Sequence, residues 1–209
     1  ERSDGACTPE KPGGLGGEIC RLAAREPHCL NGGATDDDFS FSLSGTGRFR
    51  VNLFRQRGSI AAVVRVIRFG LPTAEEAHIP PEVMRAAQMK KGIVLVTGSA
   101  GSGKSTTLAC IINEINRTRA GHILTLEDPV EYIHRHDKCI VSQREIGCDC
   151  PSYVAALRSA LRESPDVILL GEMRDKETME VAMTAPETGQ LLLSSLPTPG
   201  APHATDRNI

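Results

Sequence analysis

One short segment, the run from Gly98 to Ser105, constrains the fold of this chain more than any other. It reads Gly-Ser-Ala-Gly-Ser-Gly-Lys-Ser and fits the pattern G-x-x-x-x-G-K-[ST], which cradles phosphate groups in P-loop nucleotidases. An apolar, strand-like run (Ile93–Val96) precedes it, and a helix-like run (Thr106–Ile112) follows it. The positive end of such a helix faces a bound anion. The segment therefore predicts a strand–loop–helix unit that binds a nucleoside triphosphate.

The residue types within this loop assign chemical roles. Glycines let the backbone curl so that successive N–H groups point at phosphate oxygens. Lys104 supplies a mobile cation for the outer phosphates, and the hydroxyl of Ser105 suits a Mg²⁺ ion. An ordinary glycine-rich turn is the competing interpretation, and the flanking strand and helix disfavour it. The expected nucleotide-binding residues are Gly98, Ser99, Ala100, Gly101, Ser102, Gly103, Lys104, Ser105 and Thr106.

Composition limits the class of protein. The 209 residues are 40% hydrophobic, enough for a packed core, and a net charge of −2 gives no general reason to expect nucleic acid as a partner. Seven cysteines, an odd number without a repeated C-x-x-C pair, favour a reducing cytosol. No apolar run reaches the roughly 18 residues of a membrane span, and the first residues lack the apolar core of a signal peptide. A metal site among His134, His136, Cys139, Cys148 and Cys150 matches no standard zinc spacing, so loop residues and buried thiols are the preferred interpretation.

The chain divides into two differently patterned parts. Three strand-like segments separated by turn residues predict an antiparallel meander, at Phe39–Leu43, Arg48–Phe54 and Ile60–Ile67. A helix is expected at 15–25, while the fold of residues 1–35 is otherwise unassigned. Residues 70–90 are expected to form a breaker-rich linker and a short helix at 81–90. From residue 91 onward, strands at 93–97, 122–126, 138–142, 167–170 and 191–195 alternate with helices at 104–117, 152–162 and 176–184, which indicates an α/β sheet covered by helices.

Two of the later strands end in carboxylates: Glu127-Asp128 follows the strand 122–126, and Gly171-Glu172 follows the strand 167–170. Catalytic groups gather at the carboxyl ends of parallel strands, near the phosphate loop. The usual second nucleotidase motif has an Asp where this chain has Gly171. Glu172 is therefore the candidate to polarise an attacking water or to hold Mg²⁺ through water, with Glu127 or Asp128 sharing the work. Solvation of strand ends and helix capping are the competing interpretations, and two acids beside a P-loop favour function.

The predicted meander is rich in arginine and phenylalanine. All five phenylalanines lie between residues 39 and 69, and no Asp or Glu occurs from residue 39 to residue 74. A half-buried sheet with a solvated basic face is one interpretation. Another is an arginine supplied to the nucleotide of a neighbouring subunit, because a guanidinium fork suits phosphate. Single-stranded nucleic acid stacked on the rings is disfavoured, since strand alternation would bury them.

Several longer stretches carry a specific combined pattern. They are Asp38–Ser42, Gly47–Asn52, the P-loop with Thr106–Leu108, Thr125–Tyr132, Ser142–Gly147, Ala160–Asp175 and Glu187–Gly189. Together they resemble the secretion ATPases of type II secretion and type IV pili, and within these the PilT-like twitching-motility (pilus retraction) branch. The resemblance runs from about residue 36 to the end. Gly171-Glu172-Met173-Arg174-Asp175 points to the retraction branch, because assembly ATPases tend to carry Ile in place of Met.

The resemblance implies an ATPase that binds ATP and Mg²⁺ and works as a hexameric ring at the cytoplasmic base of a pilus machine, peripheral to the inner membrane. Residues 1–69 would be part of a PAS-like N-terminal domain, residues 70–90 a linker, and residues 91–209 a RecA-like P-loop domain truncated at its C-terminus. Glu172 would be the catalytic base and Glu127 part of an acidic "Asp box", with Lys104 completing the catalytic set. Arg48, Arg50 and Arg57 would be the arginines that reach a neighbour's nucleotide. The implied partners are identical subunits and a pilus or secretion platform protein of the inner membrane, without nucleic acid and without a transmembrane segment.

Several positions depart from the family pattern, among them Ser99-Ala100 in the P-loop, Pro186, Pro199 and Pro202, and two positions of the His box matter most. The family's His box would place histidines at 190 and 197, where this chain has Gln190 and Pro197. Proline offers neither a donor nor a titratable group. A nucleotide-binding ring or interaction protein with impaired hydrolysis, also lacking the C-terminal domain, is therefore the alternative. A P-loop small-molecule kinase is a third hypothesis, disfavoured by the arginine-rich meander and by the lack of an obvious lid segment.

Overall fold

The computed structural model describes residues 12–24, 36–43, 46–57, 59–67, 70–173 and 175–197. The chain separates between Phe69 and Gly70 into two compact units. Residues 70–90 lie within the second unit, where Ala87 packs into its core.

The first unit is a three-stranded antiparallel sheet with one helix. Helix α1 (Pro12–Leu22) precedes β1 (Asp36–Leu43), β2 (Gly47–Gln56) and β3 (Ser59–Ile67), which pair in the order β1-β2-β3, as the sequence predicts for a meander. Phe39 lies opposite Val51, and these two side chains, with Leu53, pack on Cys20 of α1. The Phe41 and Phe49 rings stack on one another with centroids 5.3 Å apart. The apolar alternation along β1 and β2 therefore builds the core of this unit.

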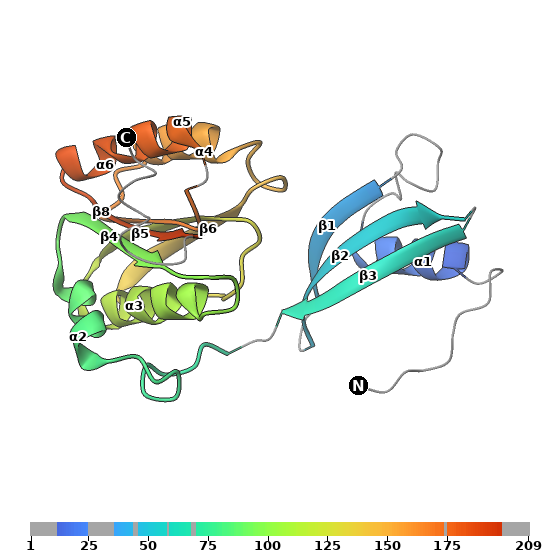
Figure 1. Ribbon diagram of the computed structural model, residues 1–209, viewed down its shortest axis with the longest axis horizontal. Helices are drawn as coiled ribbons and strands as arrows, with labels where there is room; N and C mark the ends of the chain where they lie inside the picture. The colour runs from blue at the N-terminus through green and yellow to red at the C-terminus, as the bar shows by residue number, and fades with distance from the viewer. Residues whose placement is uncertain are drawn as a thin grey trace. The chain divides into compact units, whose positions relative to one another are not determined.

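The second unit has three layers (Figure 1). Its central sheet pairs five parallel strands in the order β4-β8-β7-β5-β6. The strands are β4 (Gly92–Thr97), β5 (Gly121–Glu127), β6 (Cys139–Glu145), β7 (Val167–Leu170) and β8 (Leu191–Leu196). One face carries α2 (Pro81–Met84), a 3₁₀ turn (Arg85–Gln88) and α3 (Lys104–Thr118). The other face carries α4 (Tyr153–Ala160), α5 (Lys176–Ala182) and α6 (Thr184–Glu187).

Both faces of the inner strands β8, β7 and β5 are buried. Ile123, Leu191 and Leu193 pack against the α3 side, while Leu124, Ile168 and Leu192 pack against the α4 side. Strands covered on both faces read as continuous apolar runs rather than as alternating ones. This burial explains why the sequence of the second unit changes from the alternating pattern of the meander to short, uniformly apolar segments.

Two of the predicted helices are divided in the structure. The helix expected at 176–184 becomes α5 and α6, with a break at Met183. Pro186 lacks the N–H that a continuous helix would direct at the carbonyl of Ala182, so the helical ladder is interrupted there. The helix expected at 81–90 is one turn of α-helix followed by the 3₁₀ turn.

The core under α3 generates a stability prediction. Ile112 is fully buried, whereas Ile133 is 47% exposed in a loop. We expect Ile112→Ala to lower the free energy of unfolding by about 2–5 kcal/mol, because it removes buried methyl groups and leaves a cavity. The matched change Ile133→Ala should alter it by no more than about 0.5 kcal/mol. Urea unfolding of the two variants measures the difference, and equal losses would contradict the assigned core.

Candidate nucleotide-binding site

The P-loop connects the end of β4 to the start of α3, as the sequence predicts. Gly101 and Gly103 have φ values of 75° and 90°, in the left-handed region that glycine adopts without strain. Gly103 is the N-cap residue, and Lys104 begins the helix. The two glycines therefore let the chain turn sharply from strand into helix and leave the N–H groups of the first helical turn facing outward.

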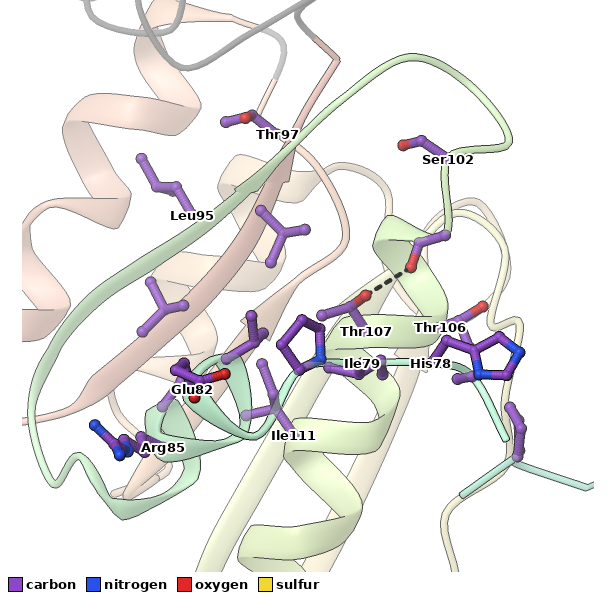
Figure 2. Close-up of a pocket in the computed structure, with 18 of the residues that line it drawn as sticks. His78, Ile79, Glu82, Arg85, Leu95, Thr97, Ser102, Thr106, Thr107 and Ile111 are labelled. Atoms are coloured by element: carbon purple, nitrogen blue, oxygen red, sulfur yellow. Dashed lines mark hydrogen bonds between the residues drawn. The ribbon is translucent and has the colours of Figure 1, made fainter. Parts of the chain in front are cut away.

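Short hydrogen bonds hold the loop in shape. The Lys104 ammonium donates to the carbonyl of Ser99 at 2.8 Å, so the lysine side chain lies back over the loop. The Thr107 hydroxyl donates to the carbonyl of Gly103 at 3.0 Å, which is the bond drawn in Figure 2. The N–H of Gly98 donates to the carbonyl of Leu196 at 3.4 Å and joins the base of the loop to β8. Ser105 is exposed at the start of the helix, where its hydroxyl is accessible to a ligand.

The acidic strand ends lie at the same edge of the sheet as this loop. The parallel strands β4, β8, β7 and β5 all end there. The N–H of Gly171 donates to the carbonyl of Leu126 at 2.8 Å, so the segments that carry Glu127 and Glu172 are directly bonded. A Cβ atom at Gly171 would lie 3.3 Å from that same carbonyl oxygen and 3.2 Å from the Tyr153 hydroxyl. This close approach is a physical reason for glycine where the usual nucleotidase motif has Asp.

Glu127 is held by hydrogen bonds at the end of β5. The Thr125 hydroxyl and the Gln143 amide donate to its Oε1 at 2.6 and 3.3 Å. Burial nevertheless raises the pKa of Glu127 above its ordinary value, because burial disfavours the charged form, and the nearby charge of Glu131 acts in the same direction. Hydrogen bonds from Thr125, Gln143 and the backbone of Glu131 counter this rise in part. Glu127 is thus a carboxylate in a setting that favours proton uptake.

Glu172 follows β7 and is half-buried. It lines a cavity of about 310 Å³ together with Asp128, Tyr153 and Asp175. Asp175 begins α5, where its carboxylate accepts the N–H and the hydroxyl of Thr178 at 2.8 and 2.7 Å. The backbone hydrogen bond from Thr178 is the main reason that the pKa of Asp175 is lowered. Asp175 is therefore a helix cap, while Glu172 and Asp128 lie together at the strand ends.

A larger cavity of about 1090 Å³ lies beside the loop. Ser102, Gly103, Thr106 and Thr107 form one side of it, and β4 and the segment 76–89 form the others (Figure 2). Its wall is largely apolar, with Ile79, Val83, Met89 and Ile111 among the lining residues. The segment that the sequence indicates as a linker therefore contributes directly to the surroundings of the P-loop.

Sequence reasoning missed two polar residues that the structure brings to this edge. The Tyr132 hydroxyl is hydrogen-bonded to the Thr106 hydroxyl at 2.9 Å, and the Gln143 amide contacts Glu127, Tyr132 and His134. In the sequence, both residues stand out as members of the stretches Thr125–Tyr132 and Ser142–Gly147, and Gln143 also lies in a polar run that continues an apolar strand. The strand expected at 138–142 extends to Glu145 and so carries Gln143 up to the site edge.

The arginines proposed to act on a neighbour's nucleotide lie in the first unit. Arg48 and Arg50 alternate along β2 with Val51 and Leu53, so they lie on the face of the sheet opposite α1. Arg50 pairs with Asp38 at 2.9 Å. Arg57 is exposed in the turn that follows β2. The basic face that the sequence predicts is therefore present, and one of its charges is engaged within the unit.

Gln190 and Pro197 lie at opposite ends of β8. Gln190 precedes the strand, where its side chain accepts the Thr188 hydroxyl at 2.6 Å. Pro197 follows Leu196, whose carbonyl is bonded to the first residue of the P-loop. Seven residue steps at about 3.3 Å each separate the two positions by about 23 Å. Of the two departures in the His box, only Pro197 is at the site edge.

The sulfur and imidazole groups after β5 behave as structural residues. Burial lowers the pKa of His134 to about 4 and raises the pKa values of the Cys139 and Cys150 thiols, so all three are neutral at neutral pH. Within the described ranges, no three His, Cys, Asp or Glu side chains cluster as metal ligands. Of the helices that the structure describes, none combines the length and the apolar character needed to cross a membrane.

Comparison with known proteins gives consistent matches. Residues 54–207 match the family described as type II/IV secretion system protein. The type IV pilus retraction ATPase PilT of Pseudomonas aeruginosa is 49% identical over 174 residues, which are 83% of this chain and 51% of that protein. The crystal structure of the pilus retraction motor PilT with bound ADP superposes with a TM-score of 0.81 at 49% identity, over 83% of this chain and 51% of that one. The ATPase DotB of Legionella pneumophila has a TM-score of 0.80 at 32% identity, over 93% of this chain and 56% of that one. The expected α/β, RecA-like fold is confirmed, and the chain spans about half the length of the relatives it matches.

The setting of Glu127 generates a pH-dependent prediction. The folded chain holds a proton on Glu127 more tightly than the unfolded chain does, so an ionised Glu127 destabilises the fold at neutral pH. This penalty disappears as the pH falls through the raised pKa toward the ordinary value. We expect Glu127→Gln to raise the melting temperature at pH 8, with a gain that shrinks as the pH is lowered to 4. Thermal unfolding across this range measures the gain, with the exposed Glu187→Gln as control, and a gain that grows on acidification would contradict the assignment.

Proposed function

The chain belongs to the type II/IV secretion system protein family, and from this premise we propose that it is an ATP-hydrolysing subunit of a ring motor that drives type IV pilus retraction or related secretion machinery. The observation that carries this proposal is the P-loop between β4 and α3, with carboxylates at the ends of the neighbouring strands β5 and β7. We regard residues 1–69 as part of a PAS-like domain and residues 91–209 as the ATPase domain.

The residues of the loop fit a magnesium-bound nucleoside triphosphate. The N–H groups at the start of α3 and the Lys104 ammonium are the donors for phosphate oxygens. The exposed Ser105 hydroxyl is an oxygen ligand of the kind that Mg²⁺ prefers, and the ion neutralises phosphate charge when bound. We assign the cavity beside Thr106 to the nucleoside, because its wall is apolar and continuous with the loop.

Glu172 is the proposed base that polarises the attacking water, and Glu127 is the second carboxylate of the reaction. Glu172 is half-buried at the end of β7, and Glu127 lies on the neighbouring strand with its position fixed by two donors. Burial raises the pKa of Glu127, which makes it a better proton acceptor than an ordinary carboxylate. The two side chains thus divide the work between a water-polarising group and a proton-accepting group.

The ring and its setting follow from the family. We propose a homohexamer in which Arg48, Arg50 or Arg57 contacts the nucleotide of a neighbouring subunit, since guanidinium groups suit phosphate and Arg57 is exposed. The partner of the ring is a platform protein of the inner membrane, and the chain acts on its cytoplasmic side. No nucleic acid takes part in this function.

The first functional prediction concerns turnover. Lys104→Ala should lower ATP hydrolysis at least about 100-fold by removing the cation that contacts the outer phosphates. Glu172→Gln should lower kcat by about 100-fold or more, with ATP affinity retained within about threefold, because the amide cannot act as a base. Phosphate release by the 209-residue chain measures kcat, and Glu180→Gln on the exposed face of α5 is the control. Turnover in Glu172→Gln equal to that of the parent would remove Glu172 from the mechanism.

A second candidate function is a nucleotide-binding ring subunit with low turnover. Pro197 favours it, because this residue follows the strand end that is bonded to the base of the P-loop and has neither an N–H nor a titratable side chain. In this case the ring would bind ATP and associate with its partners while hydrolysing slowly.

Pro197→His separates the two candidates. If the chain is a nucleotide-binding subunit with low turnover, this change should raise kcat by about tenfold, because it adds a hydrogen-bond donor beside the P-loop. If the parent already turns over at a motor's rate, the change should have little effect on kcat. Steady-state ATPase assays of both proteins give the answer. Phosphorylation of a small metabolite by the parent, in place of hydrolysis, would contradict both candidates.

A further inference from the structure

Three hydrogen bonds, joined through the side chain and backbone of Tyr132, connect the P-loop helix to Glu127. This path begins at Thr106, which directly follows Ser105 in the first turn of α3 and is half-buried. The Thr106 hydroxyl is bonded to the Tyr132 hydroxyl at 2.9 Å. Tyr132 lies in the loop after β5, only five residues beyond Glu127. The loop that follows the acidic strand end is therefore attached to the start of the nucleotide-binding helix.

Gln143 makes the hydrogen bonds that link Tyr132 to Glu127. Its Oε1 accepts the N–H of His134 at 2.7 Å, and its Nε2 donates to the carbonyl of Tyr132 at 2.9 Å. An N–H group can only donate and a carbonyl can only accept, so these two partners fix which end of the amide is which. The remaining donor of Nε2 is then available to Oε1 of Glu127, at 3.3 Å. The backbone of Tyr132 and His134 thus sets the orientation of the Gln143 amide, and the amide in turn holds the Glu127 carboxylate by a hydrogen bond.

The path joins three segments that are distant in the sequence. Thr106 is on α3, Tyr132 is in the loop after β5, and Gln143 is on β6 at the edge of the sheet. Each link lies between atoms that are partly shielded from water. Hydrogen bonds in such surroundings are stronger and more directional than exposed ones, so a displacement at one end is carried to the next group.

We propose that Tyr132 and Gln143 are positioning residues that couple nucleotide on the P-loop to the placement of Glu127. This inference rests on the proposed function, because it requires nucleotide at the P-loop. A nucleotide held by the first turn of α3 fixes Thr106, and the Tyr132 hydroxyl then fixes the loop that directly follows Glu127. Gln143 is bonded both to that loop and to the Glu127 carboxylate. Nucleotide binding at the P-loop is therefore linked to the position of the Glu127 carboxylate.

The first test needs no turnover. ADP should slow hydrogen exchange of the segment 127–134 in the parent protein. Tyr132→Phe keeps the ring and removes only the bond to Thr106, so it should bind ADP within about threefold of the parent affinity. Exchange of this segment without ADP should match the parent, while the slowing caused by ADP should be lost. Glu187→Gln, at the exposed end of α6, is the control that should retain it.

The second test uses catalysis. Gln143→Leu should lower kcat by about tenfold with KM within about threefold, because a misplaced catalytic group slows the chemical step more than binding. Tyr132→Phe should lower kcat less, and the double variant should be no slower than Gln143→Leu by more than about twofold, since both changes break one path. A residue with only a structural role would lower the melting temperature without this split or this non-additivity.

The outcomes separate the two proposals. A parent protein that does not bind ADP overturns the proposed function and this inference with it. A parent that binds ADP without slowed exchange at 127–134, or a Tyr132→Phe variant that keeps the slowing, overturns the inference alone. A parent that hydrolyses ATP while Gln143→Leu has unchanged kcat also overturns the inference and leaves the proposed function intact.

Discussion

The parallel pairing of the central strands is the constraint on which the site depends. Parallel strands end at the same edge, so this pairing brings Thr97, Glu127, Glu172 and Pro197 together from widely separated parts of the sequence. Backbone bonds between the segments after the strands reinforce this, because Gly98 is bonded to Leu196, Gly171 to Leu126 and Met173 to Ser195. The apolar layers on both faces keep the strands in register. The site is therefore rigid at its base, and only its loops are left to respond to a ligand.

This edge contains polar groups that a purely structural sheet would not bury. Thr125 and Ser195 are buried in the strands, and their hydroxyls are satisfied by the Glu127 carboxylate and the carbonyl of Gly171 at 2.6 Å each. Burial still raises the pKa of Glu127, so part of the stability of the unit is given up to keep a carboxylate there. Such a loss is typical of residues retained for chemistry rather than for packing.

Much of the fold could be predicted from the sequence, because local pattern and fold agree along most of the chain. The apolar runs at 93–97 and 167–170 are strands, and the P-loop is where its motif indicates. Helix α6 (Thr184–Glu187) was missed, because proline reads as a helix breaker, whereas Pro186 lies in the first turn of α6, where an N–H has no helical partner to lose. Tyr132 and Gln143 were missed for a different reason. Gln143 becomes a neighbour of Glu127 only when β5 and β6 pair, and Tyr132 meets Thr106 only when the loop after β5 lies beside α3.

The geometry also separates nucleotide binding from nucleotide hydrolysis. In the proposed function, binding depends on the loop between β4 and α3, whose shape is set by its own glycines, by bonds within it and by the bond from Gly98 to Leu196. Hydrolysis in that function depends on groups at the ends of β5, β7 and β8, which belong to other segments. A change confined to one of those ends, such as a proline at 197, leaves the loop able to hold phosphate. Turnover can therefore be lost or tuned in a chain of this fold while its affinity for nucleotide is preserved, and the path through Tyr132 and Gln143 is where the two properties meet.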